Sequence, residues 1–163
     1  MYRFYIGQDQ IQEDEIHILD SDVNHIRNVL RLEPGDWLVA CDGEGTDYVC
    51  RIQSLSPDDV TLSIEKKQES GTELDTRITL FQGIPKKDKM EFIIQKAVEL
   101  GAAGIVPVMM KRTVVKLEDK KKDKKRERYQ MIAESAAKQS GRGIIPEVTG
   151  FMSFREALQV SRQ

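Results

Sequence analysis

Residues 78–109, ITLFQGIPKKDKMEFIIQKAVELGAAGIVPVM, contain the pattern that decides the fold of the second half of the chain. An apolar run rich in β-branched residues at 78–82 predicts a strand, and apolar residues then recur at helical spacing over 88–100. Gly101 is expected to end this helix as a C-terminal cap, and the apolar run 105–109 predicts the next strand. The order strand, helix, strand predicts a parallel sheet with right-handed crossovers.

The residues that follow predict two more helices and a weaker third strand. A long helix is expected over 119–139, and a short one over 154–160 after a Ser-x-x-Glu capping box at 153–156. The run 144–148 is a possible third strand, although Pro146 interrupts it. Three parallel strands leave both sheet edges unpaired, whereas such sheets usually have about five strands or more. We therefore expect the chain to be part of a longer protein.

The first half predicts a small barrel of short strands. Aromatic, β-branched or alternating apolar residues predict strands at 2–6, 37–41, 48–52 and 60–64. Turn sequences separate these strands. One helix, capped by Asp20 or Ser21, is expected to bury an apolar face and to leave Arg27 and Arg31 at its border. The complete chain is thus expected to be a two-domain α+β protein.

A polar segment at 68–76, QESGTELDT, separates the halves, and we place the domains at residues 1–72 and 77–163. The halves have opposite charges. Residues 1–76 contain six Lys and Arg against 17 Asp and Glu, a net charge of −11, whereas residues 77–163 contain 19 against 10, a net charge of +9. This asymmetry indicates a polyanionic partner for the basic half.

The composition excludes several classes of protein. The 163 residues include no apolar stretch of the ~18 residues that a membrane span needs, and the N-terminus lacks the order of a signal peptide, so we expect a cytoplasmic protein without membrane contact. Cys41 and Cys50 have no partner cysteines and no neighbouring His, which predicts small core residues and no metal site. Glycine-rich nucleotide motifs and hydrolase triads are also lacking from the sequence.

Two basic segments are candidates for phosphate contacts. Lys86 and Lys87 follow the first strand of the predicted sheet, and ligands of open α/β sheets bind at the carboxyl ends of strands. Alternatively, these lysines only keep a turn soluble. The run EDKKKDKKRER at 118–128 has seven basic and four acidic residues. It suits either a surface that binds polyphosphate or a solvated helix face with i,i+4 pairs.

The segment ESAAKQSGR at 134–142 combines small residues with charged ones at the end of the long helix. Arg142 follows Gly141, and we expect its guanidinium to be exposed on a turn, where it suits bidentate contact with phosphate or carboxylate. Alternatively, Arg142 pairs with Glu134 or Glu147 and only holds the loop in place.

Five segments together resemble the RsmE family of bacterial 16S ribosomal RNA uracil-N3 methyltransferases, which belongs to the SPOUT knotted superfamily. The matching segments are 25–31 with Gly35-Asp36, 83–89, 94–101 with Pro107, 112–116, and 134–142 with Pro146. The resemblance implies a PUA-like β-barrel at 1–72 that helps to hold RNA. It also implies that 77–163 is the first part of a SPOUT-type α/β domain, whose knot binds S-adenosylmethionine at a homodimer interface.

The implied activity is S-adenosylmethionine-dependent methylation of N3 of a specific uridine in the 16S rRNA of the small ribosomal subunit, with no metal. The family's Gly-Pro-Glu-Gly-Gly loop and its later cofactor segment do not occur in the chain, so no residue is assigned to the cofactor and this chain is expected to be inactive alone. Lys138 stands where the family usually has Glu. The competing interpretations are a non-catalytic RNA- or ribosome-binding module and a purely structural dimerisation module.

The resemblance and the residue chemistry together nominate site residues. Glu134 is the candidate proton acceptor, and Arg142 is the candidate electrostatic partner of the base or anchor of a phosphate. The candidate RNA-binding residues are Arg27, Arg31, Lys86, Lys87, Arg112 and Arg142.

Overall fold

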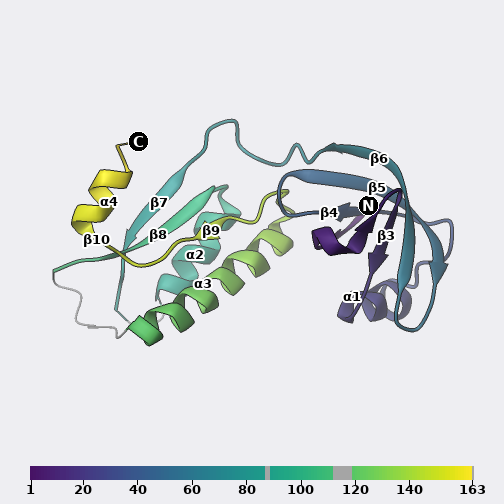
Figure 1. Ribbon diagram of the computed structural model, residues 1–163, viewed down its shortest axis with the longest axis horizontal. Coiled ribbons are helices and arrows are strands. Elements are labelled where there is room, and N and C mark those ends of the chain that lie inside the picture. The colour runs from purple at the N-terminus through teal and green to yellow at the C-terminus, as the bar shows by residue number, and fades with distance from the viewer. Residues whose placement is uncertain (87–88, 112–118, 163) are drawn as a thin grey trace. The chain divides into compact units, whose positions relative to one another are not determined.

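A computed structural model describes residues 1–86, 89–111 and 119–162, and for residues 119 and 120 it describes the backbone alone (Figure 1). The chain forms two compact units, Met1–Thr72 and Glu73–Gln163, called unit 1 and unit 2 below. Unit 1 is built mainly from antiparallel strands, and unit 2 from a parallel sheet with helices. The predicted α+β class is therefore confirmed.

Unit 1 has a six-stranded sheet in the order β1-β4-β5-β6-β3-β2, in which only the pairing of β1 with β4 is parallel. Its strands are β1 (Tyr2–Tyr5), β2 (Ile11–Gln12), β3 (Glu15–Ile18), β4 (Trp37–Cys41), β5 (Thr46–Leu55) and β6 (Val60–Glu69), with a 3-10 turn η1 at Gln8–Gln10. Four of these strands match predicted ones. The sequence analysis missed β2 and β3, although Ile16 and Ile18 alternate and are fully buried, because acidic residues surround this short pattern.

The predicted helix of unit 1 differs from a regular α-helix. One α-helical turn, α1 (Ser21–Asn24), continues as the π-helical segment η2 (His25–Val29), and the N–H of Leu30 donates to the carbonyl of His25 at 2.9 Å. The predicted N-cap is wrong as well. Asp20 precedes the helix and makes no side-chain cap bond. Its φ of 59° lies outside the extended conformation that lets a capping side chain reach the N–H groups of the first turn.

Unit 2 has four parallel strands with β8 (Gly104–Met109) at the centre. β7 (Thr79–Gly83) lies along one edge of β8, and β9 (Glu147–Val148) and β10 (Met152–Ser153) pair in succession along β8 as well. Of the predicted third strand, 144–148, only the end forms a strand, as β9, and β10 was not predicted. Pro146 has no N–H to donate to the ladder, and the strand begins only after it.

Helices cover both faces of this sheet. Helices α2 (Lys89–Glu99) and α3 (Asp119–Ser140) share one core with Ile105 and Val148, whereas α4 (Phe154–Val160) packs through Ala157 against Val106 and Val108. Neighbouring residues of β8 therefore face opposite layers, as strand alternation requires. The predicted capping box of α4 and the predicted C-terminal glycine of α2 are both confirmed.

Candidate nucleic-acid interface

Arg142 lies in the interior of unit 2 rather than on an exposed turn. Helix α3 ends at Ser140, and Gly141 then adopts a positive φ of 69°. The N–H of Arg142 donates to the carbonyl of Ala137 at 3.0 Å. This glycine turn reverses the direction of the chain at the helix end. Only 4% of Arg142 is exposed. The expectation of an exposed guanidinium is therefore wrong, because the turn directs this residue beneath the end of α2.

The guanidinium of Arg142 bonds to groups from two other segments. Its Nη1 donates to the carbonyl oxygens of Val98, in the last turn of α2, and of Ala102, in the turn that follows. Its Nε and Nη2 donate to the two carboxylate oxygens of Glu73. The alternative interpretation, that Arg142 forms an ion pair, is correct, but the partner is Glu73 instead of Glu134 or Glu147. We call Glu73, Arg142 and these two carbonyls the arginine clamp.

Glu73 also binds the backbone beyond Arg142. Its Oε1 accepts hydrogen bonds from the N–H groups of Gly143 at 3.0 Å and Ile144 at 3.1 Å. Burial acts to raise the pKa of Glu73, but the bonds from Arg142 and from these two N–H groups outweigh burial and hold that pKa below its usual range. The sequence analysis did not identify Glu73. The one sign of it in the sequence is a carboxylate beside an apolar residue, Leu74, in an otherwise polar segment.

Glu134, the candidate proton acceptor, is half-buried on α3 and has no hydrogen-bond or ion-pair partner among the described residues. Ser140, at the end of α3, lies six positions further along the helix, which corresponds to roughly 9 Å along the helix axis. Arg142 lies beyond that end and bonds to Glu73, so the structure does not bring the two candidate catalytic residues into one ion pair. Their catalytic roles remain predictions.

The candidate RNA-binding residues divide between the units. In unit 1, Arg27 is half-buried in η2, whereas Arg31 is exposed directly after it with φ 54°. In unit 2, Lys86 is exposed in the loop after β7. None of these three cations has an ion-pair partner within the described parts of the chain. Lys87 and Arg112 lie outside the described residues.

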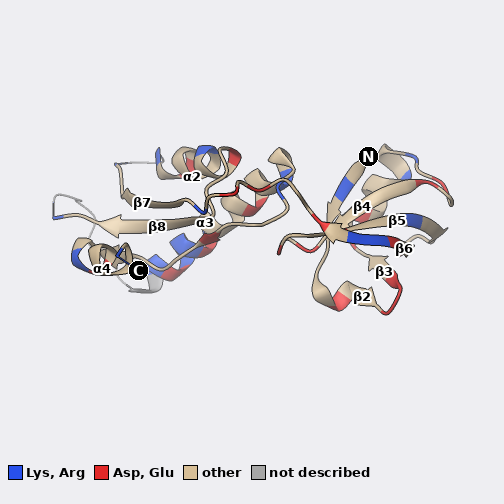
Figure 2. Cartoon of the chain, turned by 90° about the horizontal axis from the view of Figure 1, so that it is seen from above, with Lys and Arg blue, Asp and Glu red and all other residues tan. Residues whose placement is uncertain are grey.

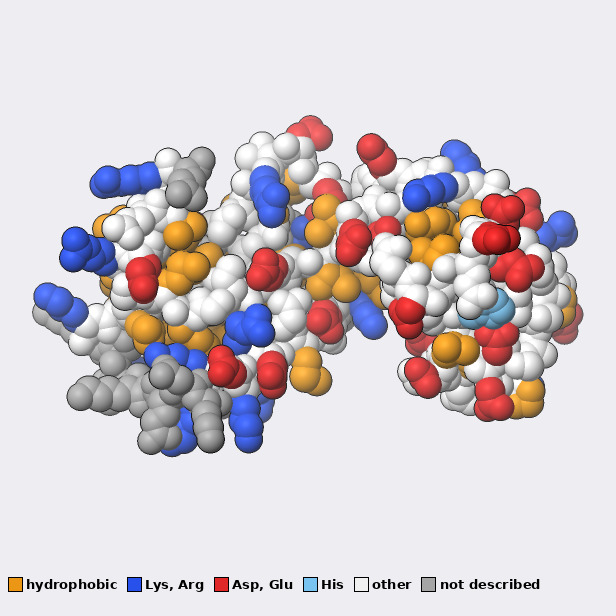
Figure 3. Space-filling model, in the orientation of Figure 1, with side chains coloured by type: hydrophobic (Ala, Val, Ile, Leu, Met, Phe, Trp, Pro, Cys, Tyr) orange, Lys and Arg blue, Asp and Glu red, His pale blue; other side chains and the backbone are white. Residues whose placement is uncertain are grey.

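Residues 119–128 of the basic run form the first half of α3, where blue and red segments alternate along the helix (Figure 2). Within it, Arg128 pairs with Glu91 of α2 at 2.7 Å, and Lys125 lies 5.9 Å from the ring centroid of Tyr129. Residues 121, 124 and 126 are exposed. On the face seen in Figure 3, most of the charged side chains of unit 1 are acidic, whereas in unit 2 Lys and Arg are interspersed with acidic side chains.

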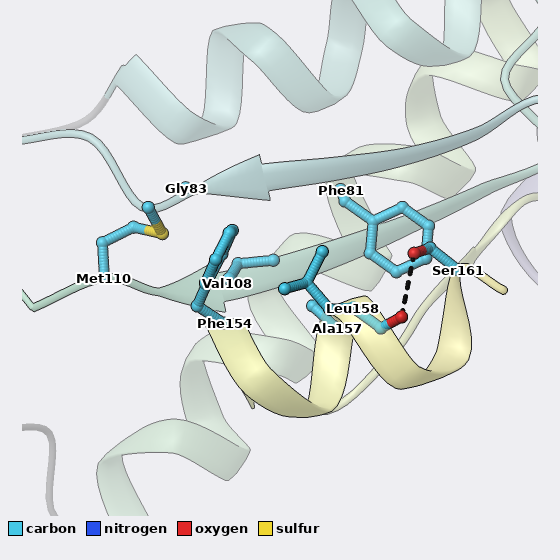
Figure 4. A pocket seen from close by; sticks show the side chains of 8 residues that line it. All are labelled: Phe81, Gly83, Val108, Met110, Phe154, Ala157, Leu158 and Ser161. Carbon is cyan, nitrogen blue, oxygen red and sulfur yellow. Dashed lines mark hydrogen bonds between the residues drawn. The ribbon is translucent and has the colours of Figure 1, made fainter.

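A cavity of about 260 Å³ lies at the carboxyl ends of β7 and β8, between the sheet and α4. Figure 4 shows its lining, which consists of Phe81, Gly83, Val108, Met110, Phe154, Ala157, Leu158 and Ser161. The hydroxyl of Ser161, the one polar side chain of this lining, donates to the carbonyl of Leu158 at 3.2 Å. The cavity therefore suits an apolar group and offers few partners to a charged one.

The described parts of the chain contain no group of three or more His, Cys, Asp or Glu that could hold a metal ion. Cys41 and Cys50 are buried core residues, as predicted, and burial raises the pKa of each thiol to about 11, which keeps both protonated. Among the same residues, no helix has the length and apolar character needed to cross a bilayer.

Known protein families match the chain in two consecutive segments. Residues 18–65 match a family described as the RNA methyltransferase PUA domain, and residues 72–163 match one described as the RNA methyltransferase domain. The first match confirms the predicted PUA-like fold of unit 1.

Individual relatives share nearly the full length of this chain. It is 40% identical over 162 residues to ribosomal RNA small subunit methyltransferase E of Bacillus subtilis (strain 168), a match that covers 98% of the chain and 63% of the relative. A crystal structure of a hypothetical protein is 40% identical with a TM-score of 0.81, covering 98% of the chain and 67% of the solved one. Ribosomal RNA small subunit methyltransferase E of Neisseria gonorrhoeae, solved bound to S-adenosyl methionine, is 35% identical with a TM-score of 0.77, covering 97% and 65%.

Proposed function

Because this chain belongs to the RNA methyltransferase family that includes ribosomal RNA small subunit methyltransferase E, we propose that the protein methylates RNA of the small ribosomal subunit. The observation that carries this proposal is the match of a PUA domain and a methyltransferase domain, in that order, to the two units. The chain spans 63% of the length of the Bacillus subtilis relative. The complete activity, its substrate and its partners are accordingly all part of the proposal.

The proposed reaction is methylation of N3 of a uridine in 16S rRNA. Neutral uracil carries a proton on N3, which a base has to accept before or as N3 gains the methyl group. The target base has to be unpaired or turned out of its stack. S-adenosylmethionine, which the Neisseria gonorrhoeae relative binds, supplies an electrophilic methyl group when it is bound.

The apolar cavity beside α4 does not by itself fit this cofactor. The carboxylate, the ammonium group and the ribose hydroxyls of S-adenosylmethionine need polar partners. Among its side chains the lining offers only the hydroxyl of Ser161, which already donates to the carbonyl of Leu158. We therefore assign no cofactor contact to the described residues. Glu134 is the proposed proton acceptor. For Arg142 we propose a positioning role, because its internal bonds hold the end of α3 against α2.

RNA contacts are proposed for cations of both units. In the described part of the chain these are the half-buried Arg27 and the exposed Arg31 and Lys86. Lys87 and Arg112, which lie outside the described part, are proposed as well. Phosphate contacts from Lys and Arg provide most of the sequence-independent affinity for nucleic acid. The charge distribution supports a major contribution from unit 2, since residues 77–163 have a net charge of +9.

A homodimer and a cytoplasmic location complete the proposal. Phe92 and Leu100 are exposed at α2, and with Ile78 they line an apolar hollow along β7. A second copy of the chain would remove this apolar surface from water, which favours association. For the full-length protein, light scattering is expected to give twice the mass of one subunit, and Phe92→Glu is expected to shift the protein toward the monomer.

The activity is tested on small ribosomal subunits that lack the modification. The full-length protein is incubated with them and with isotope-labelled S-adenosylmethionine, and the nucleosides of the digested RNA are separated by mass spectrometry. Labelled 3-methyluridine is expected, and Glu134→Gln is expected to reduce it without loss of the fold. Tight RNA binding without methyl transfer would favour the non-catalytic RNA-binding module. A protein that neither binds nor methylates the RNA would contradict the proposed function.

A further inference from the structure

We propose that the outer face of β4, β5 and β6 in unit 1 binds single-stranded RNA, with an unpaired base stacked on Trp37 and phosphates held by Arg51 and Lys66. The inference rests on the proposed RNA function. It extends that function to a surface separate in sequence from the candidates Arg27 and Arg31.

Strand register places the three side chains on one face of the sheet. In β4, Leu38 and Ala40 are fully buried in the core, so Trp37 and Val39 face the other side. Trp37 lies opposite Arg51 of β5.

The same register continues into the third strand. Val39 of β4 pairs with Val49 of β5, and Val49 pairs with Lys66 of β6. Because neighbouring strands lie about 4.8 Å apart, the aromatic ring and both cations fall within the length of one or two nucleotides.

The aromatic ring and its neighbouring cation are held in place before any ligand binds. Trp37 is 44% exposed, and the guanidinium carbon of Arg51 lies 5.7 Å from its ring centroid. The Nε of Arg51 donates to the carbonyl of Gly35 at 3.0 Å, which fixes the stem of that side chain. Within the described residues the Nη groups of Arg51 and the ammonium of Lys66 have no further partner, so they remain available to phosphate oxygens.

The charge of unit 1 also favours this face. Strands β1, β4, β5 and β6 contain four Lys and Arg and three Asp and Glu, whereas the rest of residues 1–72 contains two Lys and Arg and 12 Asp and Glu. One of the three strand acids, Asp47, is buried and pairs with Arg3 at 2.5 Å. Figure 2 shows blue segments on β5 and β6 and red ones around β2 and β3. A polyanion is therefore repelled least at this face.

Single-stranded RNA fits this arrangement better than a duplex. An exposed aromatic ring can stack on any unpaired base, whereas the bases of a duplex already stack on one another. Neighbouring cations then bind the adjoining phosphates and make the affinity dependent on salt. Glu65, exposed between Ile64 and Lys66, is the acidic residue nearest in sequence to the proposed phosphate contacts, and its removal is expected to strengthen binding.

Trp37 is the single tryptophan of the chain and thus reports directly on the proposed stacking. Titration of the complete chain with an oligouridylate is expected to quench its fluorescence, and a duplex of the same length is expected to quench it much less. Trp37→Ala is expected to weaken oligouridylate binding about tenfold, the effect of removing one stacked base. Trp37→Phe keeps an aromatic ring and is expected to weaken binding less.

Tyr2→Ala is the matched control, because Tyr2 is a similarly exposed aromatic residue of the same sheet, 49% exposed, on the opposite face. It is expected to leave oligouridylate binding unchanged. If the chain retains small-subunit RNA while neither quenching nor the effect of Trp37→Ala is observed, this inference is overturned and the proposed function stands. If the chain retains no small-subunit RNA, the proposed function fails, and this inference fails with it.

Discussion

The two side chains of the arginine clamp, Arg142 and Glu73, connect distant segments of unit 2. Arg142 connects the end of α3 to a backbone carbonyl in the last turn of α2 and to one in the turn after it, and Glu73, the first residue of the unit, binds the same guanidinium. A buried guanidinium is stable only when its charge and its N–H groups are matched. These two side chains therefore hold three separate segments together, and each leaves a buried charge behind if the other is removed.

Arg142→Ala is expected to lower the free energy of unfolding by about 3–5 kcal/mol, the usual cost of breaking a buried ion pair from one side. Urea unfolding followed by far-ultraviolet circular dichroism measures the change, because α2 and α3 provide most of the helix. Arg126→Ala, at an exposed site of α3, is the control and is expected to change stability by less than about 0.5 kcal/mol. Equal stability of Arg142→Ala and the parent protein would contradict the structural role of the clamp.

The clamp also predicts how stability depends on pH. The pKa of Glu73 is lower in the folded chain than the value of about 4.3 expected when it is unfolded, so its stabilisation is fully present above that value and is lost as the pH falls through the folded pKa. Glu73→Gln is expected to lower the melting temperature near neutral pH and to approach the parent protein in acid. Melting curves of both proteins from neutral to acid pH test this, and a constant difference would argue against the ionised clamp.

At the scale of elements, the end of α2 depends on a backbone conformation that only glycine adopts easily. Gly101 has φ 94°, the N–H of Ala102 donates to the carbonyl of Ala97 at 2.9 Å, and the turn leads directly into β8. A Cβ atom at this position would lie 2.6 Å from Cδ1 of Leu74. Both the positive φ and the close approach therefore favour glycine at this helix end.

Gly101→Ala is expected to destabilise unit 2 by about 1–2 kcal/mol because of its left-handed backbone, with any displacement of Leu74 adding to that cost. Gly150→Ala is the matched control, since a Cβ there meets no atom within 4 Å and its φ is not positive. Thermal unfolding of both variants distinguishes them. Similar melting temperatures of the two variants would show that the turn after α2 accommodates alanine at position 101 without strain.

At the scale of the whole molecule, the opposite charges of the two halves divide the proposed RNA contacts. The basic half, residues 77–163, provides most of the positive charge, with the run in α3 as its densest part. The acidic half is favourable to phosphate only on the face around Trp37 and near Arg27 and Arg31. RNA affinity is therefore expected to depend strongly on salt through unit 2 and on base stacking through unit 1.

Replacement of Lys121, Lys122, Lys124 and Lys125 by Gln tests the contribution of α3. If these lysines bind phosphates, the slope of log affinity against log salt is expected to become shallower by about 0.7–0.9 for each phosphate that the variant no longer binds. The same four positions changed to Arg keep the charge and are expected to keep the slope. An unchanged slope in the Gln variant would identify the run as a solvated helix face.

Predictions from the sequence were accurate where neighbouring residues decide the structure. The strands around residues 79–83 and 104–109, the helix between them and the capping box of α4 all follow from local periodicity and from cap chemistry. Predictions failed where local signals were short or mixed, as at β3, or where tertiary packing changed a helix, as at η2. Ile26 of the π-helical segment lies in the same core as Val23 of α1, an arrangement that a regular helical pattern predicts equally well.

By itself, the sequence determined the order of the elements, the opposite charges of the two halves and the motifs that carry the family resemblance, because all three depend on residue types and short spacings. Only the tertiary structure decided that Arg142 is buried, since its partner Glu73 lies 69 residues away. It likewise decided that Trp37 lies beside Arg51, through the register of two strands. Contacts between distant residues depend on how whole elements pack, and local patterns do not contain that information.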